Sequence, residues 1–365
     1  MKIGIIGTRG IPNHYGGFEQ FAESLSLFLT TKKHQVYVYN SSNHQYQKST
    51  YKGVQIIHCY DPEKRIGTIG QFIYDFNCIL HSRKMNYDII LQLGYTSSSI
   101  WSFLFPKKPI IITNMDGMEW KRSKYSSLTK KFLKFAEKLA INNSSFLISD
   151  SLGIKNYIQK KYNKESKFIA YGGAVFDTPN VDCIKKYDVN EFEYNMLIAR
   201  LVPENNIHII LEGITKSTIE TKLLIVGDYD TTKYSKKLYH KYKNNRQIQF
   251  LGGIYDIDIL NNLRYFSNLY FHGHSVGGTN PSLIEAMASN ALIIAHNNEY
   301  NKYILEDDAY YFKNSNEIQM LAESIHINQP QEKIKLDKNL EKINSFYNYD
   351  NINQLYLSFF NECIN

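Results

Sequence analysis

The sequence predicts an α/β protein of two domains, each built on a largely parallel sheet, and three observations carry that prediction. The chain has 365 residues, more than a single hydrophobic core usually serves. Short apolar runs alternate with segments of helical spacing, as they do in parallel βαβ units. This alternation occurs twice, on either side of a stretch around residues 172–192 that contains Gly-Gly, Pro and many polar residues.

The first series opens with a strand at residues 2–7, which ends in glycine, and a helix at residues 16–29. A glycine loop between a strand and a helix is typical of the start of a parallel α/β sheet. The following apolar runs predict strands at residues 35–39, 54–59, 88–93, 109–114, 145–149 and 167–170, and helices at 68–85, 125–142 and 152–162. Together they predict a first Rossmann-like domain over residues 1–180.

The second series repeats this alternation and predicts a second Rossmann-like domain over residues 190–345. Its strands are expected at residues 194–199, 222–226, 247–251, 269–272 and 291–295, and its helices at 206–216, 232–244, 257–267 and 282–289. A last helix is expected at about residues 349–363, where aromatic and aliphatic residues follow helical spacing. Two such domains in succession predict a central cleft between them.

The composition excludes several classes of protein. Apolar residues make up 43% of the chain and charged residues 21%, as in a folded globular protein and not a disordered one. No apolar run approaches the roughly 20 residues of a membrane-spanning helix. The cysteines lie far apart in the sequence, which argues against a disulfide or metal framework and for a reducing cytoplasm (Cys59, Cys78, Cys183, Cys363).

The charge is divided unevenly along the chain. Residues 1–180 contain 24 Lys and Arg against 12 Asp and Glu, whereas the remainder has 18 against 23. Residues 121–138 alone contain a single acid, Glu137, and seven basic residues (Lys121, Arg122, Lys124, Lys130, Lys131, Lys134, Lys138). An apolar stripe accompanies them (Leu128, Phe132, Phe135, Ala136, Leu139). This segment is either a core-packed helix with a solvated basic surface or a surface that binds anionic lipid.

The first candidate site motif is the loop between the first strand and the first helix, Gly-Thr-Arg-Gly-Ile-Pro-Asn-His-Tyr-Gly-Gly from residue 7 to residue 17. Glycine lets the backbone approach a ligand closely, and a helix N-terminus offers free N–H groups to phosphate. Gly16 and Gly17 are therefore candidate contacts of a diphosphate. The alternative is an ordinary βα turn, since the loop lacks the GxGxxG pattern of a dinucleotide site.

The second motif is His-Gly-His-Ser-Val-Gly-Gly-Thr-Asn-Pro-Ser-Leu-Ile-Glu from residue 272 to residue 285. Thr279 and Asn280 are candidate caps, and Pro281 suits the first helical position, so this helix start is also suited to an anion. Glu285 lies about one turn into the helix, where a carboxylate accepts hydrogen bonds from sugar or ribose hydroxyls. The alternative for Glu285 is a solvated acid on a helix face.

The third motif is Ala-Arg-Leu-Val-Pro-Glu-Asn-Asn, in which Arg200 follows a predicted strand. A planar guanidinium at a strand end is suited to clamp a diphosphate as charge builds on a leaving group. The alternative is a surface ion pair.

The fourth motif, Asn-Met-Asp-Gly-Met-Glu-Trp-Lys-Arg from residue 114, follows a strand end, where α/β sheets hold their ligands. Asp116 is placed to orient or deprotonate an acceptor hydroxyl, and Trp120 to stack on a sugar ring. A capping Asp beside a core Trp is the alternative.

These motifs together resemble the GT-B retaining glycosyltransferases of family 4, in the family's order and spacing. Gly-Thr-Arg-Gly-Ile-Pro, Tyr-Gly-Gly-Phe-Glu, Asn-Met-Asp-Gly-Met-Glu-Trp-Lys-Arg, Pro-Glu-Asn-Asn and His-Ser-Val-Gly-Gly-Thr-Asn-Pro-Ser-Leu-Ile-Glu are more closely similar to a rhamnosyltransferase-like branch that builds bacterial capsular and cell-wall polysaccharides. The resemblance spans almost the whole chain. It implies a GT-B fold in which the C-terminal helix, residues 346–365, crosses back to the first domain.

The sequence departs from the general family at three positions. The family usually has a pair of glutamates, and this chain has Gly277 at the position of the first. It has Asn205 where the family has a phosphate-binding lysine, and Asp116 where the family often has a histidine that contacts the donor. These changes resemble the rhamnosyltransferase-like branch, so they do not indicate an inactive protein.

The resemblance implies transfer of a sugar, L-rhamnose from dTDP-rhamnose, to a lipid-linked oligosaccharide, with retention at the anomeric carbon. The first domain would hold the acceptor and the second the donor. Asp116, Arg200 and Glu285 would be catalytic, and Tyr15, Trp120 and Arg122 would bind the acceptor. Apart from Arg200 and Glu285, the expected donor contacts are Gly16, Gly17, Asn205, Thr279, Asn280, Pro281 and Ser282.

No metal or other cofactor is expected, because the motifs contain no carboxylate pair suited to Mg²⁺. The residues that come nearest to such a pair are Asp228 and Asp230. No nucleic-acid partner is expected either. With a lipid-linked acceptor, the basic first half predicts a cytoplasmic protein attached peripherally to the inner face of the membrane. Two other functions share the architecture, a nucleotide-sugar epimerase and a non-catalytic nucleotide-sugar-binding protein.

Overall fold

The computed structural model describes residues 1–14, 16–122 and 125–364, and it divides into two compact units. Tyr15 and Lys124, both singled out above, lie outside the described residues. The first unit comprises residues 1–121, 125–171 and the segment from residue 349 onwards; the second comprises Arg122 and residues 172–348. The first unit thus ends earlier than residue 180, and the linker stretch at 172–192 folds with the second unit.

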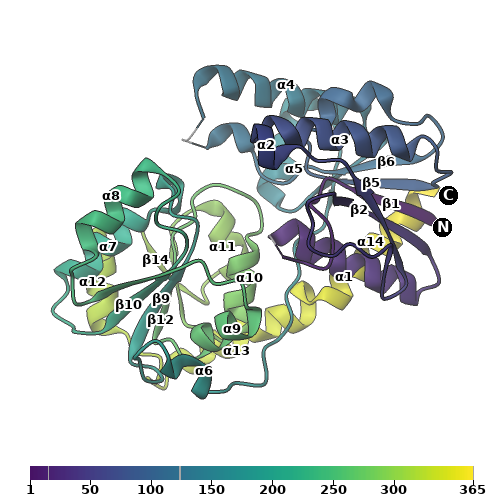
Figure 1. Cartoon of the computed structure of the whole chain (residues 1–365). Helices are drawn as coiled ribbons and strands as arrows, with labels where there is room; N and C mark the ends of the chain where they lie inside the picture. The colour runs from purple at the N-terminus through teal and green to yellow at the C-terminus, as the bar shows by residue number, and fades with distance from the viewer. Residues whose placement is uncertain (15, 123–124, 365) are drawn as a thin grey trace. The chain divides into compact units, whose positions relative to one another are not determined.

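The first unit is built on a mixed sheet with helices on both of its faces (Figure 1). Its strand order is β3-β4-β2-β1-β5-β6-β7-β8, and only the pairing of β3 with β4 is antiparallel. The strands are β1 Lys2–Ile6, β2 Gln35–Ser41, β3 Thr50–Tyr51, β4 Val54–Cys59, β5 Ile89–Leu93, β6 Ile110–Asn114, β7 Phe146–Ser149 and β8 Lys167–Phe168. The helices are α1 Gly17–Thr31, α2 Glu63–Ile66, α3 Ile69–Ser82, η1 Ser99–Leu104, η2 Glu119–Lys121, α4 Ser127–Asn143, α5 Leu152–Tyr162 and α14 Tyr349–Ile364.

The second unit has a parallel sheet of order β11-β10-β9-β12-β13-β14. Its strands are β9 Tyr194–Ile198, β10 Lys222–Val226, β11 Ile248–Gly252, β12 Leu269–His272, β13 Ile293–His296 and β14 Tyr310–Phe312. Its helices are α6 Asp182–Lys185, η3 Pro203–Asn205, α7 Ile207–Lys216, α8 Lys233–Tyr242, α9 Ile257–Tyr265, α10 Pro281–Ala288, α11 Glu299–Leu305, α12 Ser315–Ser324, α13 Glu332–Lys342 and η4 Ile343–Tyr347.

The strand order of the second sheet is that of a Rossmann fold. Numbered in chain order, its strands run 3-2-1-4-5-6 across the sheet, so the direction of winding reverses between β9 and β12. The first sheet reverses in the same way between β1 and β5. In open α/β sheets, ligands bind outside the carboxyl ends of the strands at such a point. The prediction of two Rossmann-like α/β domains is confirmed.

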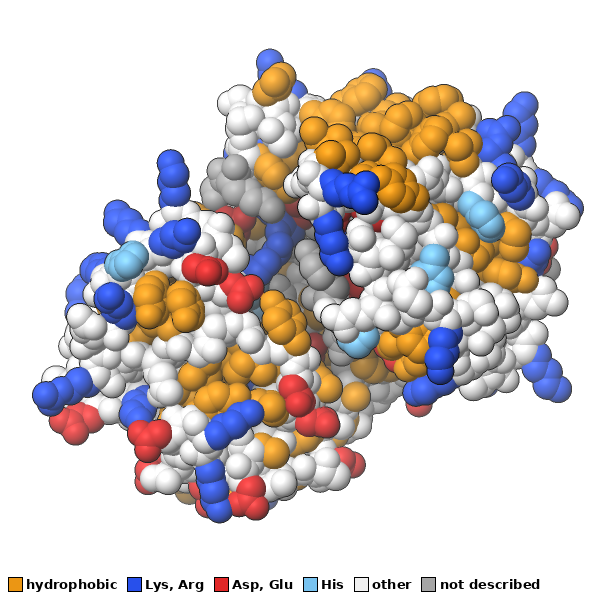
Figure 2. All heavy atoms as spheres, viewed as in Figure 1, with side chains coloured by type: hydrophobic (Ala, Val, Ile, Leu, Met, Phe, Trp, Pro, Cys, Tyr) orange, Lys and Arg blue, Asp and Glu red, His pale blue; other side chains and the backbone are white. Residues whose placement is uncertain are grey.

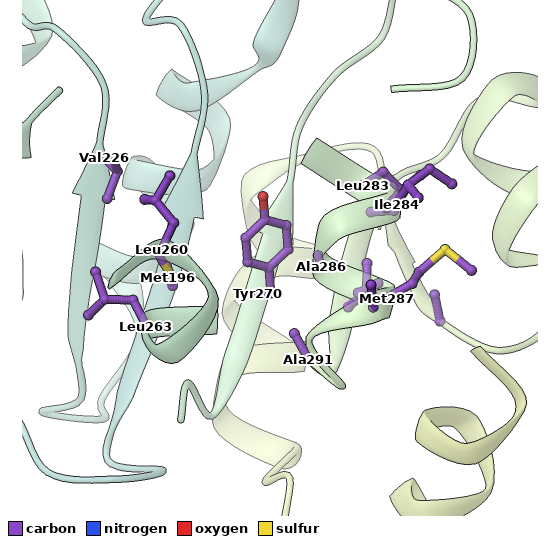
Figure 3. Close-up of a cluster of buried hydrophobic side chains, with 14 of the residues drawn as sticks. Met196, Val226, Leu260, Leu263, Tyr270, Leu283, Ile284, Ala286, Met287 and Ala291 are labelled. Atoms are coloured by element: carbon purple, nitrogen blue, oxygen red, sulfur yellow. The ribbon is translucent and has the colours of Figure 1, made fainter. Parts of the chain in front are cut away.

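The core of the second unit fixes the position of α10. Leu283, Ile284 and Met287 point from this helix into a buried cluster, which Tyr270 of β12 and Leu263 of α9 complete (Figure 3). Each of these five side chains is fully buried, and each contributes about 1.5–3 kcal/mol through apolar burial. The helix start at Asn280–Pro281 is therefore carried on a rigid element.

The C-terminal helix α14 belongs to the first unit, as the crossing-back prediction requires. Tyr356 is buried and its ring centroid lies 4.8 Å from that of Phe21 of α1. Its hydroxyl accepts a hydrogen bond of 2.9 Å from Asn114 Nδ2 at the end of β6. Asn353 donates to Ser24 of α1 at 2.9 Å. The helix thus supports both α1 and the strand that precedes Asp116.

In the described part of the chain, no helix is long and apolar enough to cross a membrane.

Candidate functional site

The loop after β1 is shaped by close backbone approaches. Gly7 has φ +90° and Gly10 has φ +121°, and an added Cβ would lie 2.2 Å from the Leu93 carbonyl oxygen and 2.2 Å from the Asn40 side chain, respectively. The buried Asn40 side chain accepts from the Ile11 N–H at 3.1 Å and donates to the Ile11 carbonyl at 2.8 Å. Glycine is required at both positions because a side chain would displace this loop.

Gly16 and Gly17 lie at the N-terminus of α1, as the first motif predicts. Gly16 is the N-cap and has no side chain to offer the helix; among the described residues, an added Cβ would meet Glu19 Oε2 at 3.4 Å. Glu19 is buried and accepts a 2.8 Å hydrogen bond from the Arg9 N–H, and burial raises the pKa of this carboxyl. Gly16 gives this helix start no side-chain cap, and the role of Gly16 and Gly17 as donor contacts stays a prediction.

Asp116 follows β6 in a left-handed conformation, with φ 41°. Its N–H donates to Asn114 Oδ1 at 3.0 Å, so the turn is held by the same Asn114 that contacts α14. Asp150 follows the neighbouring strand β7 and is buried. Burial raises the pKa of Asp150 well above its usual range, and the negative charge of Asp116 raises it further. The two carboxyl groups thus lie close together at the ends of β6 and β7.

Asp150 is a candidate site residue that the sequence prediction missed. The signal was present, because Asp150 lies between a strand and a helix, as Asp116 does; Asp150 follows its strand directly, and Asp116 follows after one residue. A small cavity of about 10 Å³ adjoins Asp116 and is lined also by Tyr95, Glu137 and Tyr157. That volume is close to the room of one water molecule.

Trp120 is held by the body of the first unit. Its Nε1 donates to the buried carboxylate of Glu137 at 2.9 Å, and its ring centroid lies 5.9 Å from that of Tyr157. The ammonium groups of Lys134 and Lys161 lie 4.5 and 5.6 Å from the ring centroid. These contacts fit the alternative interpretation, a packed Trp, and stacking of Trp120 on an acceptor sugar stays a prediction. Arg122 is the other predicted acceptor-binding residue that the structure describes, and it belongs to the second unit.

The Glu137 carboxylate accepts hydrogen bonds from four side chains of the first unit. Besides Trp120, its carboxylate accepts from Tyr157 at 2.7 Å, from Tyr162 at 2.5 Å and from Lys161 at 3.1 Å. The side chain is 2% exposed, so these bonds replace its hydration. Glu137 therefore anchors the segment that carries Trp120 to α4 and α5.

We expect Glu137→Gln to lower the free energy of unfolding of the first unit by about 1–3 kcal/mol, because an amide presents N–H groups to these donors and leaves Lys161 without its charged partner. Urea unfolding followed by tryptophan fluorescence measures this, since Trp101 and Trp120 both lie in the first unit. Glu165→Gln, at an exposed position, is the matched control. Equal midpoints for the two variants would contradict the prediction.

Arg200 follows β9 at the reversal point of the second sheet, and its side chain is exposed. Its carbonyl accepts a 2.8 Å hydrogen bond from Asn205 Nδ2, and Asn205 is buried. Asn205 thus shapes the loop that carries Arg200. Asn205 therefore has a structural role in addition to its predicted role as a donor contact. Asn206 donates to the Gly273 carbonyl at 2.9 Å and so ties this loop to the one after β12.

The loop after β12 is fixed through its backbone. The His274 carbonyl accepts from Asn298 Nδ2 at 2.9 Å and from Asn301 Nδ2 at 3.1 Å. The Ser275 hydroxyl donates to the Glu204 carbonyl at 2.7 Å. An added Cβ at Gly273 would lie 2.1 Å from the Asn205 carbonyl oxygen, so the two loops pass in direct contact. The second and third motifs therefore lie together, because the strands that precede them, β12 and β9, are neighbours in the sheet.

A stacked histidine pair lies at the end of β12 and in the loop that follows it. The rings of His272 and His274 are 4.4 Å apart and inclined by 17°. Both nitrogens of His272 and Nδ1 of His274 are buried without a hydrogen-bond partner among the described residues. Burial lowers the pKa of His272 well below its usual range, and burial together with the nearby Arg200 charge lowers the pKa of His274 to about 3. Both rings are therefore neutral at pH 7.

We expect the second unit to lose stability as the pH falls from about 6.5 towards 3. Below 6.5 the unfolded chain binds protons at His272 and His274 that the folded chain does not bind, so each contributes a loss of up to about 1.4 kcal/mol per pH unit. Hydrogen exchange of β12 between pH 7 and pH 5 measures this loss. His272→Phe should reduce the slope, whereas His240→Gln, at an exposed position on α8, should leave it unchanged. A pH-independent stability would contradict the prediction.

The start of α10 has the geometry that the second motif predicts. The Asn280 side chain caps the helix by accepting from the Ser282 N–H at 3.0 Å, and Pro281 is the first helical residue. The Ser282 hydroxyl shares a 2.7 Å hydrogen bond with Tyr270. Thr279 is buried. The roles of these four residues in donor binding stay predictions.

Glu285 is not a solvated acid. It forms an ion pair with Arg264 of α9, whose side chain is 1% exposed against 17% for Glu285. Arg264 also donates to Asn261 Oδ1 at 2.9 Å. A buried guanidinium needs a charged partner, so Glu285 has a structural role in addition to the predicted one. No signal in the sequence pairs these two residues, which are 21 positions apart.

A cavity of about 360 Å³ in the second unit is lined by residues outside these motifs, among them Phe192, Tyr265 and Leu336. Among the described residues, no group of three or more His, Cys, Asp or Glu side chains is placed to hold a metal ion.

The comparisons with known proteins divide the chain as the structure does. Residues 185–342 match the family model "Glycosyl transferases group 1", and residues 1–174 match the model "Domain of unknown function (DUF1972)". No curated protein sequence matches the chain.

Similar solved structures cover both units. Sucrose-phosphate synthase from Thermosynechococcus elongatus is 16% identical with a TM-score of 0.76, and 99% of each chain is covered. Anabaena HepE, solved with UDP-glucose, has a TM-score of 0.75 at 16% identity, again with 99% of each chain covered. A glycosyltransferase from Rickettsia africae is 16% identical with a TM-score of 0.72, over 100% of this chain and 99% of that one.

The fold and the site define an α/β protein with two Rossmann-like domains of the GT-B type. The second unit matches the group 1 glycosyl transferases, and the chain is a glycosyltransferase.

Proposed function

We propose that this glycosyltransferase takes a sugar from a nucleotide-diphosphate sugar that is bound at the β9–β12 reversal point of the second unit. The observation that carries the proposal is the convergence there of Arg200, the fixed loop 273–275 and, in the same unit, the capped start of α10. An exposed guanidinium and a helix N-terminus are the groups that stabilise a diphosphate. In HepE, a structure of the same fold, UDP and UDP-glucose have been observed.

The donor, acceptor and stereochemistry follow the resemblance described above. The donor is dTDP-rhamnose, the acceptor is a lipid-linked oligosaccharide held by the first unit, and transfer proceeds with retention and without a metal ion. Asp116 lies close to the buried Asp150, and we assign it the orientation of the acceptor hydroxyl. The lipid-linked acceptor brings the basic first unit to the inner face of the cytoplasmic membrane, where attachment is peripheral and weakens as salt rises.

The test has two stages. Thermal shift with dTDP-rhamnose, UDP-glucose and other nucleotide sugars identifies the donor, and dTDP-rhamnose is expected to give the largest stabilisation. Release of nucleoside diphosphate is then measured with and without lipid-linked acceptor, and NMR of the product gives the anomeric configuration. A donor sugar that isomerises without acceptor would identify an epimerase, and binding without release would identify a nucleotide-sugar-binding protein. Either result would overturn the proposal.

A further inference from the structure

One face of the first unit carries large apolar side chains that no other described part of that unit covers. On α4, Leu128 is 78% exposed and Phe135 is 55% exposed. On α3, Ile69 is 67% exposed, and Phe103 of η1 is 72% exposed. Single exposed apolar residues are common on soluble proteins, but a gathered group of this kind marks an interaction surface.

These residues belong to continuous helix faces. Along α3, Ile69, Ile73, Phe76 and Leu80 are spaced three or four apart and therefore lie on one face. Phe76 alone of the four is only partly exposed, because it packs against η1, where its ring centroid lies 4.9 Å from that of Trp101. The opposite face of α3 holds the buried residues, including Tyr74, Cys78 and Ile79. The exposed face is thus distinct from the core.

The α3 and α4 faces join into one surface. Phe72 of α3 packs against Phe132 of α4 with ring centroids 5.8 Å apart, and η1 contacts both helices. Figure 2 shows hydrophobic side chains gathered over this part of the first unit, with Lys and Arg around them. We call this surface the apolar face and define it by five exposed members, Ile69, Ile73, Phe103, Leu128 and Phe135.

Basic residues lie within and beside the apolar face. Leu128, Lys131, Phe135 and Lys138 are spaced three or four apart on α4 and are all exposed, so apolar and cationic side chains alternate along one stripe. Exposed basic side chains also flank the other elements of the face (Lys64, Arg65, Lys107, Lys108).

The acidic residues of α3 and α4 are buried and do not lie on the apolar face. Glu137, the one acid of α4, is buried beneath Trp120, Tyr157, Tyr162 and Lys161. Asp75, the one acid of α3, is buried and accepts a hydrogen bond of 2.5 Å from Ser97. The exposed surface of α3 and α4 is therefore apolar and positive, without a carboxylate on either helix to offset its charge.

We propose that the apolar face inserts into the interfacial region of a bilayer that contains anionic lipid, with Ile69, Phe103, Leu128 and Phe135 entering the acyl boundary and the lysines of α4 contacting headgroups. Apolar side chains with a cationic surround are the combination that holds an amphipathic surface in a membrane interface. This inference deepens the peripheral attachment in the proposed function, because it assigns the attachment to an apolar surface and not to charge alone.

The test is co-sedimentation of the full chain with vesicles of phosphatidylcholine alone and with added phosphatidylglycerol, at about 0.1 M and 1 M NaCl, between which the Debye length falls from about 10 to about 3 Å. The apolar variant is Phe103→Asn with Leu128→Asn, and its control is Met320→Asn with Ile334→Asn, two residues of the second unit that are 63% and 61% exposed. The charge variant is Lys131→Gln with Lys138→Gln, and its control is Lys236→Gln with Lys237→Gln on α8.

We expect the wild-type chain and both controls to bind the anionic vesicles. The apolar variant should bind at least tenfold more weakly at both salt concentrations, and the charge variant several-fold more weakly at low salt alone. An independent readout is quenching of Trp101, which lies on η1, by lipids brominated along the acyl chain, measured in a Trp120→Phe chain. Quenching is expected with anionic vesicles and should disappear in the apolar variant.

Three results would overturn the inference: no binding of the wild-type chain to either vesicle, equal binding of the apolar variant and its control, or a dimer in solution that the apolar variant dissociates. The last would identify a second copy of the chain as the occupant of the face. Donor hydrolysis without vesicles reports separately on the proposed transfer reaction, and the apolar and charge variants, made in the wild-type chain, should leave it unchanged. Failure of one proposal is therefore distinguishable from failure of the other.

Discussion

Arg200→Ala is expected to lower the turnover number by about 10²-fold or more, because the leaving nucleoside diphosphate loses the cation that stabilises its developing charge. Arg200 is exposed at the end of β9, so its removal leaves no cavity in the core. Asn205 bonds the backbone carbonyl of Arg200 and not its side chain, so the loop keeps its shape in the variant. Steady-state release of nucleoside diphosphate with acceptor present measures the effect.

Two further variants make this prediction sharper. Arg200→Lys keeps the charge and loses the planar fork, so it should fall between the wild type and Arg200→Ala. Arg246→Ala removes an exposed arginine elsewhere in the second unit and should leave turnover unchanged. Activity of Arg200→Ala within a few-fold of the wild type, with the fold intact, would remove Arg200 from the catalytic machinery.

Glu285→Ala is expected to destabilise the second unit by about 3–5 kcal/mol, because it leaves the buried Arg264 guanidinium without its charged partner. The milder Glu285→Gln keeps the shape and loses the charge, so it should be destabilised less while its affinity for the donor falls. Hydrogen exchange of α9 and α10 measures the stability, and titration with nucleotide sugar measures the affinity.

A double variant separates the structural role of Glu285 from the binding role. In Arg264→Met with Glu285→Leu both charges are gone, so much of the lost stability should return while donor binding does not. If the double variant recovers donor binding as well, Glu285 acts only through Arg264. If Glu285→Gln binds donor with unchanged affinity and turns over normally, its role as a donor contact is wrong.

The fold followed from the sequence wherever buried strands and amphipathic helices carried a clear period. Strands β10 and β12 and helix α5 have the bounds that the sequence predicts, since continuous apolar runs and a Ser cap mark them. The two-residue strand β3 is too short to show a period. Helices α11 to α13 were not predicted; α13, for instance, buries few apolar residues and is otherwise rich in Lys, so its helical face is weakly marked.

The sequence placed each motif of the candidate site at the end of a predicted strand or at the start of a predicted helix, and the strand order seen in the structure brings two of these motifs together. Motifs that follow β9 and β12 must meet, because those strands are neighbours in the sheet. Side-chain partners are different, since contacts such as Arg264 with Glu285 and Trp120 with Glu137 depend on how helices pack. Asn205 illustrates this difference: its position suggests a ligand contact, whereas its buried amide is used to hold the Arg200 carbonyl.

The return of α14 to the first unit has a consequence for biogenesis. Tyr356 and Phe360 are buried in that unit, so its core stays incomplete on the ribosome until residues 349–364 have been synthesised and have emerged. The second unit, formed by the intervening residues, is free to fold earlier, which reverses the usual N-to-C order. A nascent chain stalled before residue 349 would therefore expose the surface of α1 that meets Tyr356, and it would be a natural client for chaperones that recognise apolar surfaces.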